Sequence, residues 1–193
     1  CLVVAHLECP DIYLRSSRPP GSCLQGIVQS NESAESSSAR RFPHPATTGS
    51  ASGILRENGR LPFIIVPVKS LESVRRAAID HDAYETLIRT TEAKAVFIFC
   101  PEPYRPENTF NARMFADHFG VSEDPATGSA NGCLAGYLLR HGYFPGDSLD
   151  IRVEQGCEIH RPSLIHCRAE RHGESITVQV GGRVIPVARG ELL

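Results

Sequence analysis

Apolar residues recur in short, regularly punctuated groups from residue 61 onward. Three groups are dense enough to predict strands: 61–68 (LPFIIVPV), 93–100 (AKAVFIFC) and 110–117 (FNARMFAD). The second is predicted to be a buried strand because residues 95–100 form a continuous apolar run. In the third, alternate positions share one face of the strand. These positions are Phe110, Ala112, Met114 and Ala116.

A helical pattern follows the first of these strands. Ser70 is suited to the N-cap position, because its hydroxyl can accept a hydrogen bond from a backbone amide of the first turn. Leu71, Val74, Ala78 and Ile79 then follow helical spacing. The pattern predicts a helix that begins after Ser70.

A second helix is predicted over residues 128–141, and it is apolar around most of its circumference. Gly128, Gly132 and Gly136 recur every four residues and therefore share one face. Glycine in a helix interior costs up to about 1 kcal/mol relative to alanine. We therefore expect Gly132 and Gly136 to allow close packing of a buried helix against a sheet, whereas Gly128 lies at the start of the helix.

The C-terminal third predicts four short strands separated by turns. They cover residues 149–156 (LDIRVEQG), 164–171 (LIHCRAER), 174–180 (ESITVQV) and 183–190 (RVIPVARG). Consecutive strands joined by short turns favour antiparallel hairpins. Several strands beside one buried helix indicate an α+β fold.

Residues 1–60 differ from the rest of the chain. After a short apolar start they are dominated by Ser, Pro, Thr and Gly, so they bury little and are typical of loop, linker or disorder. The chain as a whole has 193 residues, 41% hydrophobic and 22% charged, as in ordinary globular proteins. A net charge of −2 and the absence of Trp argue against a nucleic-acid partner. No apolar run is long enough to span a membrane.

Seven cysteines, an odd number without CxxC spacing, argue against a disulfide framework or a zinc site. We therefore expect a reducing, cytoplasmic compartment. No signal peptide is recognisable at the start. The first residue is Cys and the only Met is Met114, so we expect a processed or trimmed chain, or a fragment of a longer one.

The stretch SEDPATGSANG, residues 122–132, carries the candidate chemistry. The backbone amides that open the helix lack intrahelical partners and, with the helix dipole, favour an anion such as a substrate carboxylate. Gly128 allows a ligand to approach the backbone. Thr127 and Ser129 place hydroxyls there, as caps or as ligand donors.

Two acids, Glu123 and Asp124, stand beside this helix start, and Pro125 restricts the backbone that orients them. A carboxyl group beside a bound anion favours its protonated form, as a general acid requires. The alternative is a purely structural one, because capped helix starts followed by small residues are common. The spacing alone leaves both interpretations open.

Longer motifs resemble the PhzF-like family of phenazine-biosynthesis proteins. They are RMFADHFGVSEDPATGSANGCLAGYLL (113–139), EQGCEIHRPSLI (154–165) and VQVGGRVIPVARGEL (178–192). They match the family's Gly-x-x-Glu-Asp-Pro-x-Thr-Gly-Ser-Ala motif, its Gln-Gly and Arg-Pro-Ser segments and its terminal Gly-Gly strand, in order. The resemblance extends over about residues 54–193.

The resemblance implies a diaminopimelate-epimerase-like fold, in which each of two lobes wraps a mixed, largely antiparallel sheet around a central helix. It implies that residues 1–53 are an irregular Ser/Pro-rich segment or a remnant of the first lobe, and that residues 54–193 form the second lobe. It further implies an isomerase that moves a proton on a small carboxylic-acid substrate, a small anion, without a cofactor. We also expect a homodimer. The residues implicated are Asp124 and Ser129 in catalysis, and Glu123, Thr127, Gly128 and Ala130 in substrate binding.

The first lobe of the family pattern is not recognisable. Its Gly-Asn-Pro turn, Ser-Glu-Thr segment and Cys-Gly-His-Ala-Thr segment are absent as such, and residues 30–36 and 43–51 show only a faint likeness to the last two. Glu32 and Glu35 are the candidates for the family's catalytic Glu.

Two rival functions remain open at this point. The chain could be a non-catalytic binding or dimerisation module that keeps the fold but lacks the opposing acid or base. It could also be a two-thiol racemase, although Cys133 fits a core position and the motif carries Asp124 where a thiol is needed.

The histidines near the motifs, His118, His160 and His166, form no HxxxH or HExxH pair, so no metal is expected. We expect His118 to be an exposed loop residue. Arg161 either pairs with a carboxylate or anchors its turn, and the sequence favours neither.

Overall fold

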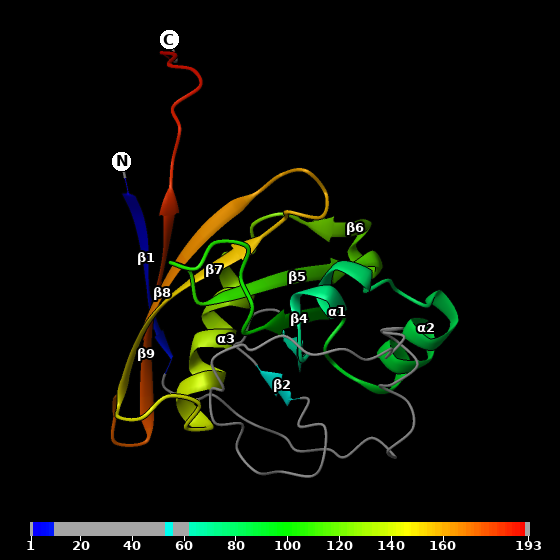
Figure 1. Cartoon of the computed structure of the whole chain (residues 1–193), viewed down its shortest axis with the longest axis horizontal. Coiled ribbons are helices and arrows are strands. Elements are labelled where there is room, and N and C mark those ends of the chain that lie inside the picture. The colour runs from blue at the N-terminus through cyan, green and yellow to red at the C-terminus, as the bar shows by residue number, and fades with distance from the viewer. Residues whose placement is uncertain (1, 10–52, 56–61, 192–193) are drawn as a thin grey trace.

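The computed structural model describes residues 2–9, 53–55 and 62–191, which form one curved sheet with helices packed against it (Figure 1). The strands are β1 (Leu2–Cys9), β2 (Gly53–Leu55), β3 (Phe63–Pro67), β4 (Ala95–Cys100), β5 (Phe110–Ala116), β6 (Val121–Asp124), β7 (Ser148–Gln155), β8 (Ser163–His172) and β9 (Ser175–Arg183). The helices are α1 (Leu71–Arg76), α2 (His81–Thr90), α3 (Gly128–Arg140) and a 3-10 turn, η1 (Asp117–Phe119).

The nine strands lie in the order β1-β9-β8-β7-β5-β4-β3-β2, and β6 pairs with β5 beside this path. The pairs β3–β4 and β5–β7 are parallel, and the other pairs are antiparallel. The predicted mixed, largely antiparallel α+β fold is therefore confirmed. In Figure 1, α3 lies against the inner side of the curve that β7, β8 and β9 make.

Helix α3 is the centre of the larger core. All its residues from Ala130 to Leu139 are buried, and they pack with inward residues of β3, β4, β5, β7, β8 and β9. Gly132 and Gly136 are among the buried positions, as predicted for close packing. Cys133, 4% exposed, is a core residue here.

The smaller core lies between the sheet and the pair α1 and α2. The predicted N-cap is confirmed, since the Ser73 amide donates to the Ser70 hydroxyl at 3.2 Å. The helix was expected to continue through Ala78 and Ile79, and this is wrong. Ala77 is extended, with ψ 133°, and the Asp80 carboxylate caps a second helix by accepting from the Ala83 amide at 3.0 Å.

The predicted fourth C-terminal strand is also corrected. The first three are β7, β8 and β9, but β9 already ends at Arg183 and residues 184–191 form no strand. Pro186 lacks the backbone donor that a ladder requires. Val184, Ile185 and Val187 are exposed, and Val187 keeps 93% of its accessible surface.

The N-terminal stretch contributes strand β1, which pairs antiparallel with β9 along its whole length. The apolar start of the chain thus joins the sheet, while residues 10–52 lie outside the described part. The division at residue 53 stays a prediction. None of the described helices is both long and apolar enough to cross a bilayer.

Replacing Gly156 by alanine should lower the free energy of unfolding by at least about 2 kcal/mol. Gly156 has φ +78°, and an added Cβ would lie 2.5 Å from the Arg161 carbonyl oxygen and 2.9 Å from Pro125 Cα. Gly173→Ala is the matched control, because φ is +63° there and no atom lies within 4 Å. Urea denaturation of both variants measures the difference, and equal losses would contradict the close approach.

Candidate functional site

The predicted site residues lie where β6 ends and α3 begins. No strand was predicted over residues 121–124, which form β6. Strand β6 pairs with β5 through Met114 opposite Asp124 and Ala116 opposite Val121. Because successive side chains of a strand point to opposite faces, Glu123 and Asp124 are separated into two different environments.

Glu123 faces β5 and forms a buried ion pair with Arg113. Arg113 Nε donates to Glu123 Oε1 at 3.0 Å, and Nη2 donates to Oε2 at 2.7 Å. The two side chains are only 10% and 7% exposed. Both carboxylate oxygens are thus engaged by one guanidinium, the strong fork-to-fork geometry. The predicted role of Glu123 in substrate binding stays a prediction, and its described contacts are structural.

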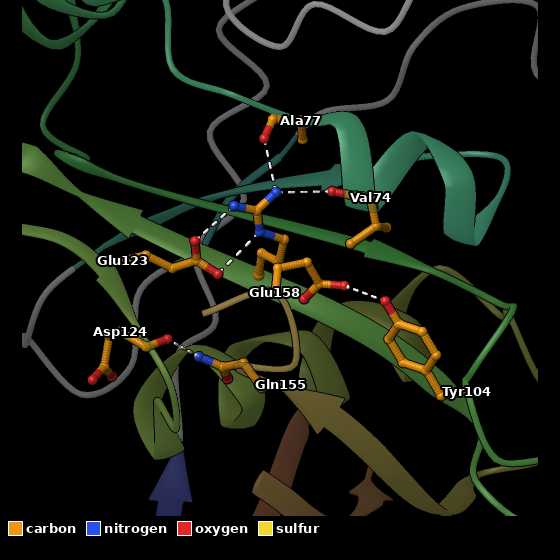
Figure 2. Close-up of polar contacts among 8 residues, drawn as sticks. Val74, Ala77, Tyr104, Glu123, Asp124, Gln155 and Glu158 are labelled. Atoms are coloured by element: carbon orange, nitrogen blue, oxygen red, sulfur yellow. Dashed lines mark hydrogen bonds and ion pairs between the residues drawn. The ribbon is translucent and has the colours of Figure 1, made fainter. Parts of the chain in front are cut away.

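The third nitrogen of Arg113 connects this pair to α1. Its Nη1 donates to the carbonyl oxygens of Val74 at 3.0 Å and Ala77 at 2.7 Å, where α1 ends (Figure 2). The Val74 carbonyl also accepts from the Ala77 amide at 3.2 Å, the last backbone bond of α1, and a cation at this end complements the helix dipole. Arg113 therefore ties α1, β5 and β6 together in the interior.

Asp124 lies on the other side of β6, beside Gln155 (Figure 2). It is partly exposed, and its Oδ2 accepts a 2.5 Å hydrogen bond from the Thr127 hydroxyl. Asp124 is therefore held at the N-terminus of α3, residues 127–130, which we call the mouth of α3, while it is still open to water. The sequence prediction that Asp124 stands beside the helix start is confirmed.

The mouth of α3 carries backbone donors without a side-chain cap. Thr127 occupies the N-cap position, but no side chain there accepts from the helix. The first helical bond runs from the Asn131 amide to the Thr127 carbonyl at 3.1 Å, so the amides of 128–130 have no partner within the helix. Gly128 and Ser129 are exposed, whereas the Ala130 side chain is fully buried. Ala130 as a whole residue has no accessible surface, so its predicted role in substrate binding stays a prediction.

Gln155 completes the arrangement, although no role was predicted for it from the sequence. Its side chain is fully buried at the end of β7 and makes hydrogen bonds to Asp124, Thr127 and Asn131. A signal was present in the strand pattern. Leu149, Ile151 and Val153 occupy inward positions, and the next inward position carries an amide instead of an apolar side chain.

The turn after β7 answers the question left open about Arg161. Its amide donates to the Gly156 carbonyl at 2.9 Å, and its own carbonyl accepts from the Ser163 hydroxyl at 3.3 Å. The residue as a whole is exposed. Arg161 thus anchors the turn through its backbone, and that turn brings Gly156 beneath Pro125.

Three of the described thiols, Cys100, Cys157 and Cys167, fit no acid or base role. Burial, reinforced by Glu158 and Glu154, raises the pKa of Cys157 to about 11. Burial also raises the pKa of Cys100 and of Cys167 to about 12. These thiols remain protonated at neutral pH, and a two-thiol mechanism has no support from them.

His118 and His160 are exposed and His166 is partly exposed. The expected exposure of His118 is confirmed, but the residue lies in the 3-10 turn η1 and not in a loop. Within the described ranges, no group of three or more His, Cys, Asp or Glu residues could hold a metal ion. Glu32 and Glu35, the candidates for an opposing acid or base, lie outside the described residues.

The family model for phenazine biosynthesis-like proteins, PhzC-PhzF, matches residues 30–190. The chain belongs to this family. An uncharacterized isomerase of Mesorhizobium japonicum is 32% identical over 137 residues, which are 68% of this chain and 45% of that protein. A trans-2,3-dihydro-3-hydroxyanthranilate isomerase of Pseudomonas chlororaphis is 44% identical over 85 residues, 44% of this chain and 30% of that protein.

Solved structures show the same fold. A PhzF-family phenazine biosynthesis protein of Bacillus anthracis superposes with a TM-score of 0.69 at 19% identity, covering 94% of this chain and 57% of that one. A predicted epimerase of Pseudomonas aeruginosa gives a TM-score of 0.64 at 26% identity, covering 98% and 58%. The chain spans less than half the length of these curated relatives and rather more than half of these solved chains.

Replacing Arg113 by methionine should destabilise the protein by about 3–5 kcal/mol, because it leaves the Glu123 carboxylate buried without its partner. The exposed pair Arg168–Asp150, with side chains 68% and 59% exposed, is the control, and Arg168→Met should cost no more than about 1 kcal/mol. Chemical denaturation measures both values. A small loss for Arg113→Met would show that the pair does not hold β6 to α1.

Proposed function

We propose that this chain is the second lobe of a PhzF-like isomerase that moves a proton on a small carboxylic-acid substrate without a cofactor. One observation carries the proposal: the partly exposed Asp124 carboxylate lies beside helix amides that no side chain caps. An anion can bind there while a proton donor or acceptor stands next to it.

The roles of the residues follow from their positions. The amides of the exposed Gly128 and Ser129 would hold the substrate carboxylate, and the Ser129 hydroxyl would turn toward it. Asp124 would give or take the proton. Thr127 donates to Asp124 and so supports it, and we assign Glu123 to holding β6 in place.

The names of the relatives support an isomerisation. Relatives from Pseudomonas chlororaphis and Pseudomonas fluorescens are named trans-2,3-dihydro-3-hydroxyanthranilate isomerases, after a carboxylate-bearing molecule, and two others are described as uncharacterized isomerases. A carboxylate is the kind of group that the mouth of α3 favours. We therefore propose this compound as the first probe for activity.

An isomerisation by proton transfer also needs a second acid or base, which faces the substrate from a different side than Asp124. Two Glu residues, Glu32 and Glu35, remain the candidates within this chain. A binding or dimerisation module without that group is the alternative. The exposed apolar side chains of Val184, Ile185 and Val187 favour association with another surface.

Homodimer formation is expected in either case. The chain has a mass of 21.1 kDa, so size-exclusion chromatography with light scattering should return about twice this value. A mass equal to that of one chain at concentrations of tens of micromolar would contradict the expectation.

Asp124→Asn should abolish the proton transfer. The 193-residue protein is incubated with trans-2,3-dihydro-3-hydroxyanthranilate in deuterium oxide, and solvent deuterium in the recovered compound is followed by mass spectrometry. The rate should fall at least about a hundredfold, since an amide cannot exchange the proton as a carboxyl group does.

Asp150→Asn is the matched control, because this carboxylate is exposed on β7 and pairs with Arg168 away from the site. It should retain the full rate. Deuterium uptake that persists in Asp124→Asn would refute the role of Asp124, and no uptake by the unaltered chain would refute the isomerase and leave the binding module.

A further inference from the structure

Gln155 is an amide placed where the pattern of β7 calls for an apolar side chain. It is fully buried, and so is Val153 two positions before it. Burying an amide without partners costs on the order of 2 kcal/mol or more. Packing alone does not explain this residue, because an apolar side chain would fill the same space without that cost.

The hydrogen bonds of Gln155 fix the orientation of its amide. Its Nε2 donates to the Asp124 backbone carbonyl at 2.7 Å, and its Oε1 accepts from the Thr127 backbone amide at 3.2 Å. A backbone carbonyl can only accept and a backbone amide can only donate. The nitrogen and the oxygen of Gln155 therefore cannot be exchanged.

The same nitrogen also sets the direction of the Thr127 hydroxyl. Gln155 Nε2 donates to Thr127 Oγ1 at 3.0 Å, so the hydroxyl must send its own proton elsewhere. It sends it to Asp124 Oδ2, at 2.5 Å. Donation thus runs in one direction, from amide to hydroxyl to carboxylate.

We propose that Gln155 is the positioning residue of this site, because it decides which oxygen of Asp124 is left for a ligand. Oδ2 is taken by Thr127, and among the described residues none donates to Oδ1. Oδ1 is then the oxygen that exchanges a proton with the substrate. This last step rests on the proposed function, whereas the orientation of Asp124 does not.

Asn131 links the same amide to the first turn of α3. Its Nδ2 donates to Gln155 Oε1 at 2.8 Å and to the Thr127 carbonyl at 2.9 Å. Gln155 therefore contacts both parts of the site, the helix that would bind the substrate carboxylate and the strand end that carries Asp124. The distance between the two parts is set by one rigid side chain.

The test combines Gln155→Met, Thr127→Val and the double variant, with trans-2,3-dihydro-3-hydroxyanthranilate as the substrate. Each single variant should lower kcat about tenfold or more through lost orientation of Asp124, with KM changed less than about threefold because the helix amides remain. The kcat of the double variant should lie no more than about twofold below that of the less active single variant, since both substitutions act through the Asp124 carboxylate.

Two controls separate positioning from loss of stability. Thr127→Ser keeps the hydroxyl and should restore kcat to within about threefold of the unaltered protein. Ile151→Ala removes core volume from the same face of β7, where Ile151 is 2% exposed, and should lower stability with kcat unchanged. The proposal would be overturned if the two single losses of kcat multiplied in the double variant. It would also be overturned if Ile151→Ala lost as much kcat as Gln155→Met.

Crystal structures of the variants give a readout that does not depend on activity. In Gln155→Met and Thr127→Val the Asp124 carboxylate should leave its position beside residue 127, while in Ile151→Ala it should not. If Gln155→Met does not fold, the position of the Asp124 carboxylate in Thr127→Val alone tests whether these hydrogen bonds orient it. If the unaltered chain turns over no substrate, the proposed function fails; an unmoved Asp124 in the variants refutes the positioning role.

Discussion

Helix α3 has ten consecutive buried residues, from Ala130 to Leu139, so water reaches it mainly at its ends. The sheet curls around it because a helix without a polar face must be covered on several sides. Its backbone dipole is therefore weakly screened along most of its length. The exposed N-terminal residues, Gly128 and Ser129, are where that dipole meets solvent, and this is where the acidic side chain is placed.

Two adjacent acids show how strand geometry divides one sequence motif between two tasks. Glu123 turns inward to a guanidinium that is 10% exposed, while Asp124 remains partly open to water. Neither environment follows from the residue type, since both are carboxylates one position apart. The difference arises because β6 pairs with β5 and the pleat sends the two side chains to opposite faces.

Much of the fold could be predicted because its strongest elements are apolar and long. The continuous run of β4 and the all-round apolar helix α3 were recognisable, and so was the Ser70 cap. Strand β6 was not, because VSED has no apolar alternation and only its pairing makes it a strand. The break after α1 depends on Asp80, which caps a new helix.

The functional site was predicted only where its residues are close together in the sequence. The helix mouth and Asp124 lie within one short motif, so local spacing was sufficient to bring them together. Gln155 and Arg113 reach the site from other strands, and the residues that they contact lie up to 39 positions away in sequence. Such contacts depend on tertiary packing, although a lone polar residue at an inward strand position is a usable signal.

The parallel pairing of β5 with β7 has a consequence for the order of folding. These strands are joined by a connection that contains β6 and α3, and they come into register only when Ala112 lies opposite Gln155. The bond between Gln155 and Asp124 spans 31 residues, so chain entropy must be lost before it can form. The acid at the mouth of α3 would therefore reach its final position late, after the surrounding sheet has closed, and a peptide that carries only the motif would not reproduce it.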